Sequence, residues 1–219
     1  MAVILALETA TTNCSVAVVD SKGEVLVKED YGSKYSHGEK LHVYIDEILK
    51  EAGLTQNDLD AIAVSAGPGS YTGLRIGVSA AKGLCFALDI PLITVGTLES
   101  LVRQLSADQG YLIPMLDARR MEAYTAVYDH SHQELVPMQP QILDAESFSD
   151  YLSKGPVTFI GTANEKFSEV CTHENARFVN EKLPSAKELI ALAQAKYEAG
   201  DFADLAYFEP DYLKAFQPG

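Results

Sequence analysis

The segment from Ala61 to Leu88 has the residue types and the spacing that can bind an anion. Ala61–Val64 is a short apolar run that predicts a buried strand, and a helical pattern follows after a few residues. Gly67 and Gly69 lie between the two, on either side of a proline. Because a glycine-rich turn at a helix N-terminus presents backbone N–H groups, it suits a phosphate, and it also suits close contact with another backbone.

The spacing of the glycines differs from both common phosphate-binding motifs. The third glycine of Gly67-x-Gly69-x-x-x-Gly73 comes one residue later than in the dinucleotide-binding motif G-x-G-x-x-G. The Lys-Ser or Lys-Thr pair that completes a P-loop is missing. The sequence therefore excludes both motifs.

The helix that follows carries a stripe of small residues. Gly73, Gly77 and Ala81 recur every four residues, so they share one face of the helix. Each internal glycine costs roughly 1 kcal/mol relative to alanine, and close packing must offset that cost. Two interpretations stay open: the stripe faces the chain's own sheet or a neighbouring helix, or it faces another subunit.

The other residues that could do chemistry form no recognisable site. His37 and His42 are five residues apart and do not share a helical face closely, and no H-E-x-x-H motif occurs. The three cysteines are far apart and lack C-x-x-C spacing, which predicts reduced, buried thiols. No G-x-S-x-G motif marks a nucleophile. We therefore expect no catalytic residue and no metal ligand.

Composition limits the partners of the chain. Its 219 residues include 31 acidic and 17 basic residues, so the net charge is −14. Such an excess repels phosphate backbones, and the chain alone should not bind nucleic acid tightly. The N-terminal apolar run ends at Glu8 and no basic segment precedes it, so we interpret it as a strand rather than a signal peptide. No apolar stretch reaches 18 residues, and we expect a cytoplasmic protein that does not enter a membrane.

The first half of the chain predicts three strands, at residues 3–7, 14–19 and 24–30. Ser36 and Glu39 have the spacing of a capping box, which predicts a helix that runs to about Ala52 and ends at Gly53. The apolar face of this helix consists of Leu41, Ile45, Ile48 and Ala52. The glycine-rich strand–turn–helix segment, a strand at 91–95 and a helix at about 98–105 follow.

The same order of elements begins again near residue 110. We predict strands at 110–116, 122–128, 134–138, 156–160 and 176–179, and helices at 145–152, 164–170 and 185–199. The aromatic tail at 207–213 is expected to dock on the body of the protein. The fold class is therefore α/β, with two duplicated βββαβα lobes at residues 1–105 and 106–219.

This order is that of the actin, hexokinase and Hsp70 ATPase (ASKHA) fold, in which a turn after the first strand of each lobe holds phosphate. The matching turns contain Thr9, Thr11 and Thr12 in the first lobe and Asp117 in the second. Ala10 and Ala118 stand where glycine would let backbone N–H groups reach a phosphate. We therefore interpret both turns as degenerate phosphate turns, without an intrinsic cofactor.

Two arginines follow Ala118 in the second of these turns. Arg120 adds bulk to the turn, which weakens the case for a phosphate there. Arg119 and Arg120 could bind an anion, but a salt-bridged pair is the interpretation that the sequence favours.

Several segments together resemble the bacterial TsaB family, also called YeaZ, of the tRNA threonylcarbamoyladenosine pathway. These segments are Glu8–Thr12, Ser36–Leu41, Gly67–Gly77, Asp117–Tyr124 and Pro210–Leu213. The resemblance covers nearly the whole chain, and Gly67–Gly77 is its most specific part. It implies an ASKHA fold and a subunit without catalytic residues.

The resemblance also implies partners. The paralogue TsaD is the catalytic subunit and binds metal through an H-x-x-x-H motif, whose histidine positions correspond here to Thr97 and Leu101. Neither residue supplies an imidazole nitrogen. TsaB would pair with TsaD for the transfer of threonylcarbamoyl to adenosine 37 of tRNAs that read ANN codons. The ATPase TsaE would join this complex, TsaC would supply threonylcarbamoyl-adenylate, and tRNA would be contacted only through the complex.

In this family the helices at about 37–52 and 72–88 form the contact with TsaD, and the same face supports a homodimer when TsaD is missing. We therefore expect these interface residues: His37, Leu41, Ile45, Ile48, Tyr71, Gly73, Leu74, Gly77 and Ala81. ATP or ADP would bind only at a junction between subunits. An independent ASKHA-type ATPase or small-molecule kinase is the alternative function, and a peptidase ranks last because no nucleophile or metal motif is found.

Overall fold

The computed structural model of the protein describes residues 1–20, 22–32 and 35–211. Its described residues fall into two compact units. The first unit combines Met1–Ser100 with the segment from Pro184 onward, and the second unit is Leu101–Leu183. In the described part of the chain, no helix is both long enough and apolar enough to cross a membrane.

The first unit is built on a mixed five-stranded sheet of the described residues, with strand order β3-β2-β1-β4-β5. Its strands are β1 (Ile4–Glu8), β2 (Cys14–Val19), β3 (Val25–Asp30), β4 (Ala61–Ser65) and β5 (Leu92–Val95). Strands β1, β2 and β3 pair antiparallel, whereas β1, β4 and β5 pair parallel. Its helices are α1 (His37–Ala52), the short 3-10 helix η1 (Gln56–Asp58), α2 (Tyr71–Leu88) and α6 (Ala186–Ala199).

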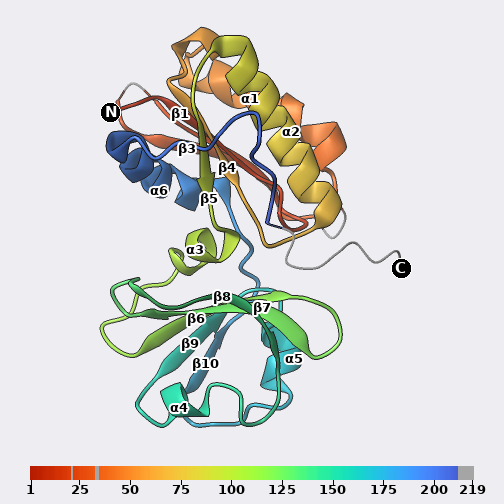
Figure 1. Ribbon diagram of the computed structural model, residues 1–219, viewed down its shortest axis with the longest axis vertical. Helices are drawn as coiled ribbons and strands as arrows, with labels where there is room; N and C mark the ends of the chain where they lie inside the picture. Colours follow the sequence, from red (N-terminus) through yellow and green to blue (C-terminus); the bar gives the residue numbers. More distant parts are fainter. Residues whose placement is uncertain (21, 33–34, 212–219) are drawn as a thin grey trace. The chain divides into compact units, whose positions relative to one another are not determined.

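Both faces of this sheet are covered, as Figure 1 shows. Leu5 and Leu7 face a core formed with α1 and α2, while Ile4 and Ala6 face a second core formed with α6. Successive side chains of a strand point to opposite faces, so burial on both faces requires an uninterrupted apolar run, as β1 has. The face toward α6 is rich in small residues: Ala6, Ala17, Ala61 and Ala63.

The second unit repeats the topology with strand order β10-β9-β6-β7-β8. Its strands are β6 (Tyr111–Asp117), β7 (Glu122–Asp129), β8 (Glu134–Ile142), β9 (Val157–Ile160) and β10 (Ala176–Val179), and its helices are α4 (Ser149–Leu152) and α5 (Asn164–Ser168). Helix α3 (Thr97–Val102) connects the two units along the chain. The predicted duplication of three antiparallel strands followed by helices and parallel strands is therefore confirmed.

Some predicted boundaries and caps are wrong. The predicted strand 134–138 extends to Ile142, because β8 is an edge strand that pairs only with β7 and tolerates Pro137 and Pro140. Ser36 makes no capping hydrogen bond to α1, since its hydroxyl donates to Asp30. Gly53 ends α1 in the left-handed conformation, as predicted.

The predicted lobes at 1–105 and 106–219 differ from the two units of the structure. The observed boundary lies at Ser100, but the segment from Pro184 belongs to the first unit instead of the second. Helix α6 packs Leu189 and Ile190 on the first sheet. Of the tail predicted at 207–213, Phe208 packs against the core of the first unit and the Asp211 N–H donates to Ala66 O at 2.8 Å, whereas residues 212 and 213 lie outside the described residues.

Candidate functional site

The turn after β1, residues 9–13, is buried, although its counterpart in a nucleotide-binding lobe has to reach a ligand. Thr9 is 1% exposed and Ala10 2% exposed, and Thr11 is also buried. The polar backbone groups of this turn bond within the protein. Ala10 N–H donates to Glu8 Oε1 at 2.6 Å, and Ala10 O accepts from Ser70 N–H at 2.7 Å. The turn thus occupies the N-terminus of α2, where a phosphate would otherwise bind.

The glycine stripe accounts for this close packing. A Cβ atom at Gly73 would overlap Thr9 O, and one at Gly77 would overlap Thr9 Oγ1. A Cβ atom at Gly69 would meet Ala10 in the same way. The stripe therefore faces the chain's own backbone, as one of the two open interpretations held, but it meets the turn after β1 rather than the sheet or a neighbouring helix.

Glu8 is a fully buried carboxylic acid at the end of β1. Burial raises its pKa from 4.5 to about 7, although hydrogen bonds from Ala10 N–H and the Ser65 hydroxyl oppose the shift. Ser65 Oγ lies 2.7 Å from Thr97 Oγ1, so a short polar chain continues into α3. Glu8 Oε2 and Thr9 Oγ1 have no hydrogen-bond partner among the described residues. In the sequence Glu8 ends the apolar run and begins the segment Glu8–Thr12; an acid directly after a buried apolar run was the available signal for its burial.

His37 lies in the same interior region. It is 2% exposed, and its Nε2 lies 2.8 Å from Thr11 O. Since a carbonyl only accepts, Nε2 carries the proton. Burial lowers the pKa of His37, so the ring is neutral at pH 7. The predicted interface role does not fit this position, because the side chain is inside the first unit.

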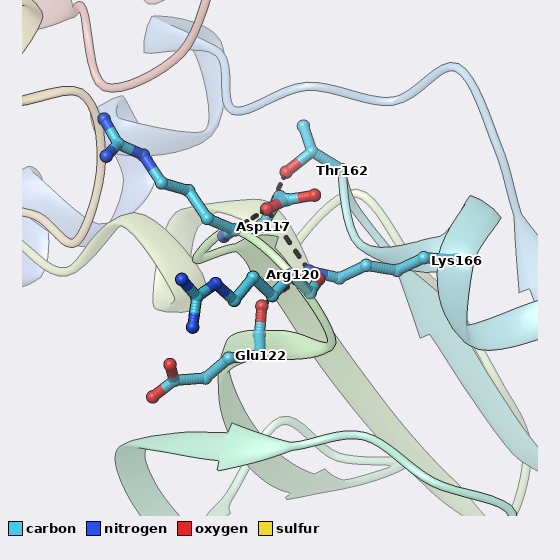
Figure 2. A network of polar contacts seen from close by, with 6 residues as sticks. Asp117, Arg120, Glu122, Thr162 and Lys166 are labelled. Atoms are coloured by element: carbon cyan, nitrogen blue, oxygen red, sulfur yellow. Dashed lines mark hydrogen bonds and ion pairs between the residues drawn. The ribbon is translucent and has the colours of Figure 1, made fainter. Parts of the chain in front are cut away.

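The turn after β6, residues 118–121, is open and is held by a lysine (Figure 2). Lys166 Nζ donates to Arg120 O at 2.8 Å and to Glu122 O at 2.6 Å, and it lies 3.2 Å from Asp117 Oδ1. Asp117 N–H donates to Thr162 Oγ1 at 2.9 Å, and Arg119 N–H donates to Asp117 Oδ1 at 2.5 Å. Carbonyls and a carboxylate thus surround an ammonium group, so this side of the turn suits a cation rather than a phosphate.

The two arginines of this turn are exposed and have left-handed backbone conformations. The φ angle is 72° at Arg119 and 50° at Arg120. For residues with a side chain this conformation costs roughly 1–2 kcal/mol each. It persists because Lys166, Asp117 and Thr162 fix the turn from behind.

The cysteines and the possible metal-binding side chains of the described residues form no reactive site. Burial raises the pKa of Cys14 and of Cys85 to about 11, so both are protonated at pH 7 and are poor nucleophiles. Cys171 is also buried. Among the described residues, no three His, Cys, Asp or Glu side chains come together as a metal site.

The outer face of α2 forms a groove with α1. The groove has a volume of about 720 Å³ and runs beside His42 of α1. On α2 it is lined by Tyr71, Thr72, Arg75, Ile76, Ser79, Ala80, Gly83 and Leu84. Arg75 stacks on Tyr71, with its guanidinium carbon 4.3 Å from the ring centroid. Phe86, which is 83% exposed, continues this face at helical spacing from Ser79 and Gly83.

Most of the expected interface residues lie behind this face instead of on it. The buried ones are His37, Leu41, Ile45, Ile48, Gly73, Leu74, Gly77 and Ala81. Tyr71 alone of the nine lines the groove. The apolar stripe used for the prediction marks core positions, since a helix in a globular unit turns that stripe inward. The outward stripe at residues 72, 75, 76, 79 and 83 was the signal to use.

Comparison with known proteins places the chain among tRNA-modification proteins. The family model described as TsaD, tRNA N6-adenosine threonylcarbamoyltransferase, matches residues 32–216. The tRNA threonylcarbamoyladenosine biosynthesis protein TsaB of Bacillus subtilis is 30% identical over 96% of this chain and 93% of its own length. TsaB of Haemophilus influenzae is 29% identical with the same coverage. The tRNA N6-adenosine threonylcarbamoyltransferase of Bacillus anthracis is 39% identical, but over only 42% of this chain and 32% of its own length.

Solved structures give the same result. YeaZ from Pseudomonas aeruginosa is 27% identical, with a TM-score of 0.78 over 97% of this chain and 100% of its own. A second solved structure, described as that of a protein with similarity to peptidase YEAZ from P. aeruginosa, has a TM-score of 0.84 at 27% identity, over 98% of this chain and all of its own. The ethanolamine utilization protein EutJ from Carboxydothermus hydrogenoformans, at 15% identity and a TM-score of 0.51 over 88% of this chain and 89% of its own, shares the fold alone.

Proposed function

The chain belongs to the TsaB family of tRNA threonylcarbamoyladenosine biosynthesis proteins, and we propose that it is the non-catalytic subunit of the modifying complex. In this role it binds and activates the catalytic paralogue TsaD in the cytoplasm. The complex forms N6-threonylcarbamoyladenosine at position 37 of tRNAs that read ANN codons. TsaE and tRNA join through the complex.

The observation that carries this proposal is the contrast between full-length and partial similarity. TsaB relatives match 96% of the chain and 93% of their own length, whereas a threonylcarbamoyltransferase matches at only 32% of its length. At the two positions that correspond to the metal-binding histidines of TsaD, the chain has Thr97 and Leu101, both fully buried. Thr97 Oγ1 lies 2.7 Å from Ser65 Oγ, so its hydroxyl group makes a buried hydrogen bond inside the first unit.

The groove beside α2 is the surface that we assign to TsaD. Its support is geometric: an apolar groove lined by Tyr71 and Arg75, with the exposed Phe86 farther along the same helix, is typical of a surface that packs against helices. The same surface would serve a homodimer when TsaD is missing. The glycine stripe contributes indirectly, because it holds α2 close to the β1 turn.

In this proposal, neither the turn after β1 nor the turn after β6 binds a nucleotide. In the first turn Ala10 donates and accepts hydrogen bonds inside the unit, and in the second turn Lys166 occupies the carbonyl groups. ATP or ADP would therefore bind only at a junction with another subunit.

Co-purification with TsaD from the same organism, followed by tRNA modification from purified components, tests the function. Ser79→Arg places a long charged side chain in the groove and should reduce TsaD binding at least about tenfold while the chain stays folded. Thr172→Arg, on an exposed loop of the second unit, is the matched control and should bind normally. Gly77→Leu is a poor test of the interface, since the added side chain would overlap Thr9.

Two outcomes would contradict the proposal. One is full modification activity without this chain. The other is tight binding and turnover of Mg-ATP by the isolated chain, measured by calorimetry and phosphate release, which would favour an independent ATPase.

A further inference from the structure

The side chains of Arg119 and Arg120 are exposed on the turn after β6. Neither guanidinium forms an ion pair with any residue in the described part of the chain. The salt-bridged pair that the sequence allowed is therefore not observed there. Their backbone groups take part in the turn, and their side chains are exposed.

The turn presents these side chains from a fixed backbone. Lys166, itself only 15% exposed, reaches Arg120 O, Glu122 O and Asp117 Oδ1 from α5. Figure 2 shows the side chain of Arg120 extending from the turn on the side away from the body of Lys166. Backbone strain that neighbouring contacts maintain is concentrated at functional sites, and here it positions two adjacent cationic side chains.

The chemistry of the pair identifies the ligand class. A guanidinium group binds phosphate oxygens through two parallel hydrogen bonds, which an ammonium group does not do. Asp117 Oδ1 already accepts from Arg119 N–H and contacts Lys166, so it competes little for the guanidinium groups. Glu122 lies on the same side of the turn as Arg120 (Figure 2), and its negative charge weakens the attraction of the pair for any anion.

We propose that Arg119 and Arg120 contact phosphate groups of the RNA backbone. The inference rests on the proposed function, in which tRNA binds the complex rather than the chain alone. With a net charge of −14 the chain cannot hold RNA by general attraction, so a local pair of contacts adds to the affinity supplied by the partner. A free phosphate or a nucleotide shares the same chemistry and is the other source that the experiment separates.

The test uses the full chain assembled with TsaD and compares two double variants. Arg119→Ala/Arg120→Ala removes the pair, while Arg103→Ala/Arg177→Ala removes two exposed arginines elsewhere in the same unit. The affinity of each complex for unmodified tRNA is measured at several salt concentrations. The first variant should bind about tenfold more weakly or worse, with a salt dependence lower by about one to two phosphate contacts. The second should match the wild type.

A glycine variant separates lost contact from lost folding. Arg119→Gly/Arg120→Gly suits the left-handed backbone, so the chain should stay folded while tRNA affinity falls as in the alanine variant. Arg119→Lys/Arg120→Lys keeps the charge and should retain the salt dependence with part of the affinity. Unchanged tRNA affinity in the alanine and glycine variants would overturn the inference.

Titration with inorganic phosphate and with ATP distinguishes the sources. If the arginine pair is needed for binding these small anions and tRNA affinity is unchanged without it, the RNA assignment is wrong.

The wild-type complex distinguishes failure of the arginine inference from failure of the proposed function. If it forms and modifies tRNA, and the alanine variant does both equally well, only the arginine inference fails. If the wild-type chain neither binds TsaD nor supports modification, the proposed function fails and the inference with it.

Discussion

The turn after β1 and the turn after β6 occupy the same place in two sheets of the same topology, yet they are built differently. The first is buried, with Thr9 and Ala10 packed on α2. The second is open, with two exposed arginines and a lysine behind it. The comparison shows that one topology supports two unlike turns, depending on the helix that follows the fourth strand.

That helix is α2 in the first unit and α5 in the second. Glycines let α2 bring its backbone against the first turn, where Gly73 and Gly77 leave room for Thr9. In α5 a long side chain fixes the second turn instead, because Lys166 donates hydrogen bonds to its carbonyl groups. Both arrangements use the polar backbone groups of the turn for hydrogen bonds inside the unit, so the turn after the first strand has a structural role in each.

The first turn should be the more sensitive of the two to added atoms. Gly73→Ala places a Cβ on the backbone oxygen of Thr9, which can move only with the strand, and should lower the free energy of unfolding by about 3 kcal/mol or more. Gly83→Ala is the control in the same helix, because a Cβ there meets nothing within 4 Å. It should raise the free energy by roughly 0.5–1 kcal/mol. Urea unfolding of both variants measures the difference in stability. Equal stabilities would show that Gly73 does not pack closely against Thr9.

The acid beside the first turn should make stability depend on pH. The pKa of Glu8 is about 7 in the folded protein and 4.5 in a free side chain, so the folded state holds the proton more tightly. The stabilising contribution is complete below pH 4.5 and is lost as pH rises toward 7, by up to roughly 3 kcal/mol. Glu8→Gln should remove this part of the pH dependence, as measured by urea unfolding from pH 4.5 to 8.

Glu198→Gln, at an exposed position, serves as the control for Glu8 and should leave the profile as it is. Parallel profiles for wild type and Glu8→Gln would show that the carboxyl group titrates normally.

The second turn should depend on its lysine. Lys166→Met removes the donor shared by Arg120 O and Glu122 O and should cost about 2 kcal/mol of unfolding free energy, because the partly buried bond to Glu122 O is lost together with the bond to Arg120 O. Lys182→Met, at an exposed position in the same unit, should change stability by less than about 0.5 kcal/mol. If both variants lost similar stability, the cause would be the removal of a positive charge and not the loss of the hydrogen bonds from Lys166.

Relief of backbone strain is the smallest expected effect. Arg120→Gly should raise the free energy of unfolding by about 0.5–1 kcal/mol, since glycine adopts a φ of 50° without steric cost but loses more chain entropy. The same change at Arg177, in strand β10, should destabilise by a similar amount because glycine weakens a strand. Thermal unfolding of the two variants gives opposite shifts if the conformation of the turn is strained.

The sequence could predict the elements and the duplication because their signals are local. The apolar run of β1, the apolar periodicity of α1 and Gly53 at its end each depend on residues that are close in the chain. The exclusion of the P-loop and of the dinucleotide-binding motif also needed only local spacing. The resemblance to TsaB, confirmed by relatives matched over 93% of their length, depended on several such segments together.

Tertiary structure decided how these elements are used, because the deciding contacts join residues far apart in the chain. The stripe at Gly73 and Gly77 could face either a partner or the chain itself, and only the position of Thr9 settles that it faces the interior. Lys166 contacts a carbonyl 46 residues away, and α6 returns to a sheet formed at the N-terminus. Spacing along the chain determines which face a residue lies on, but packing determines what that face meets.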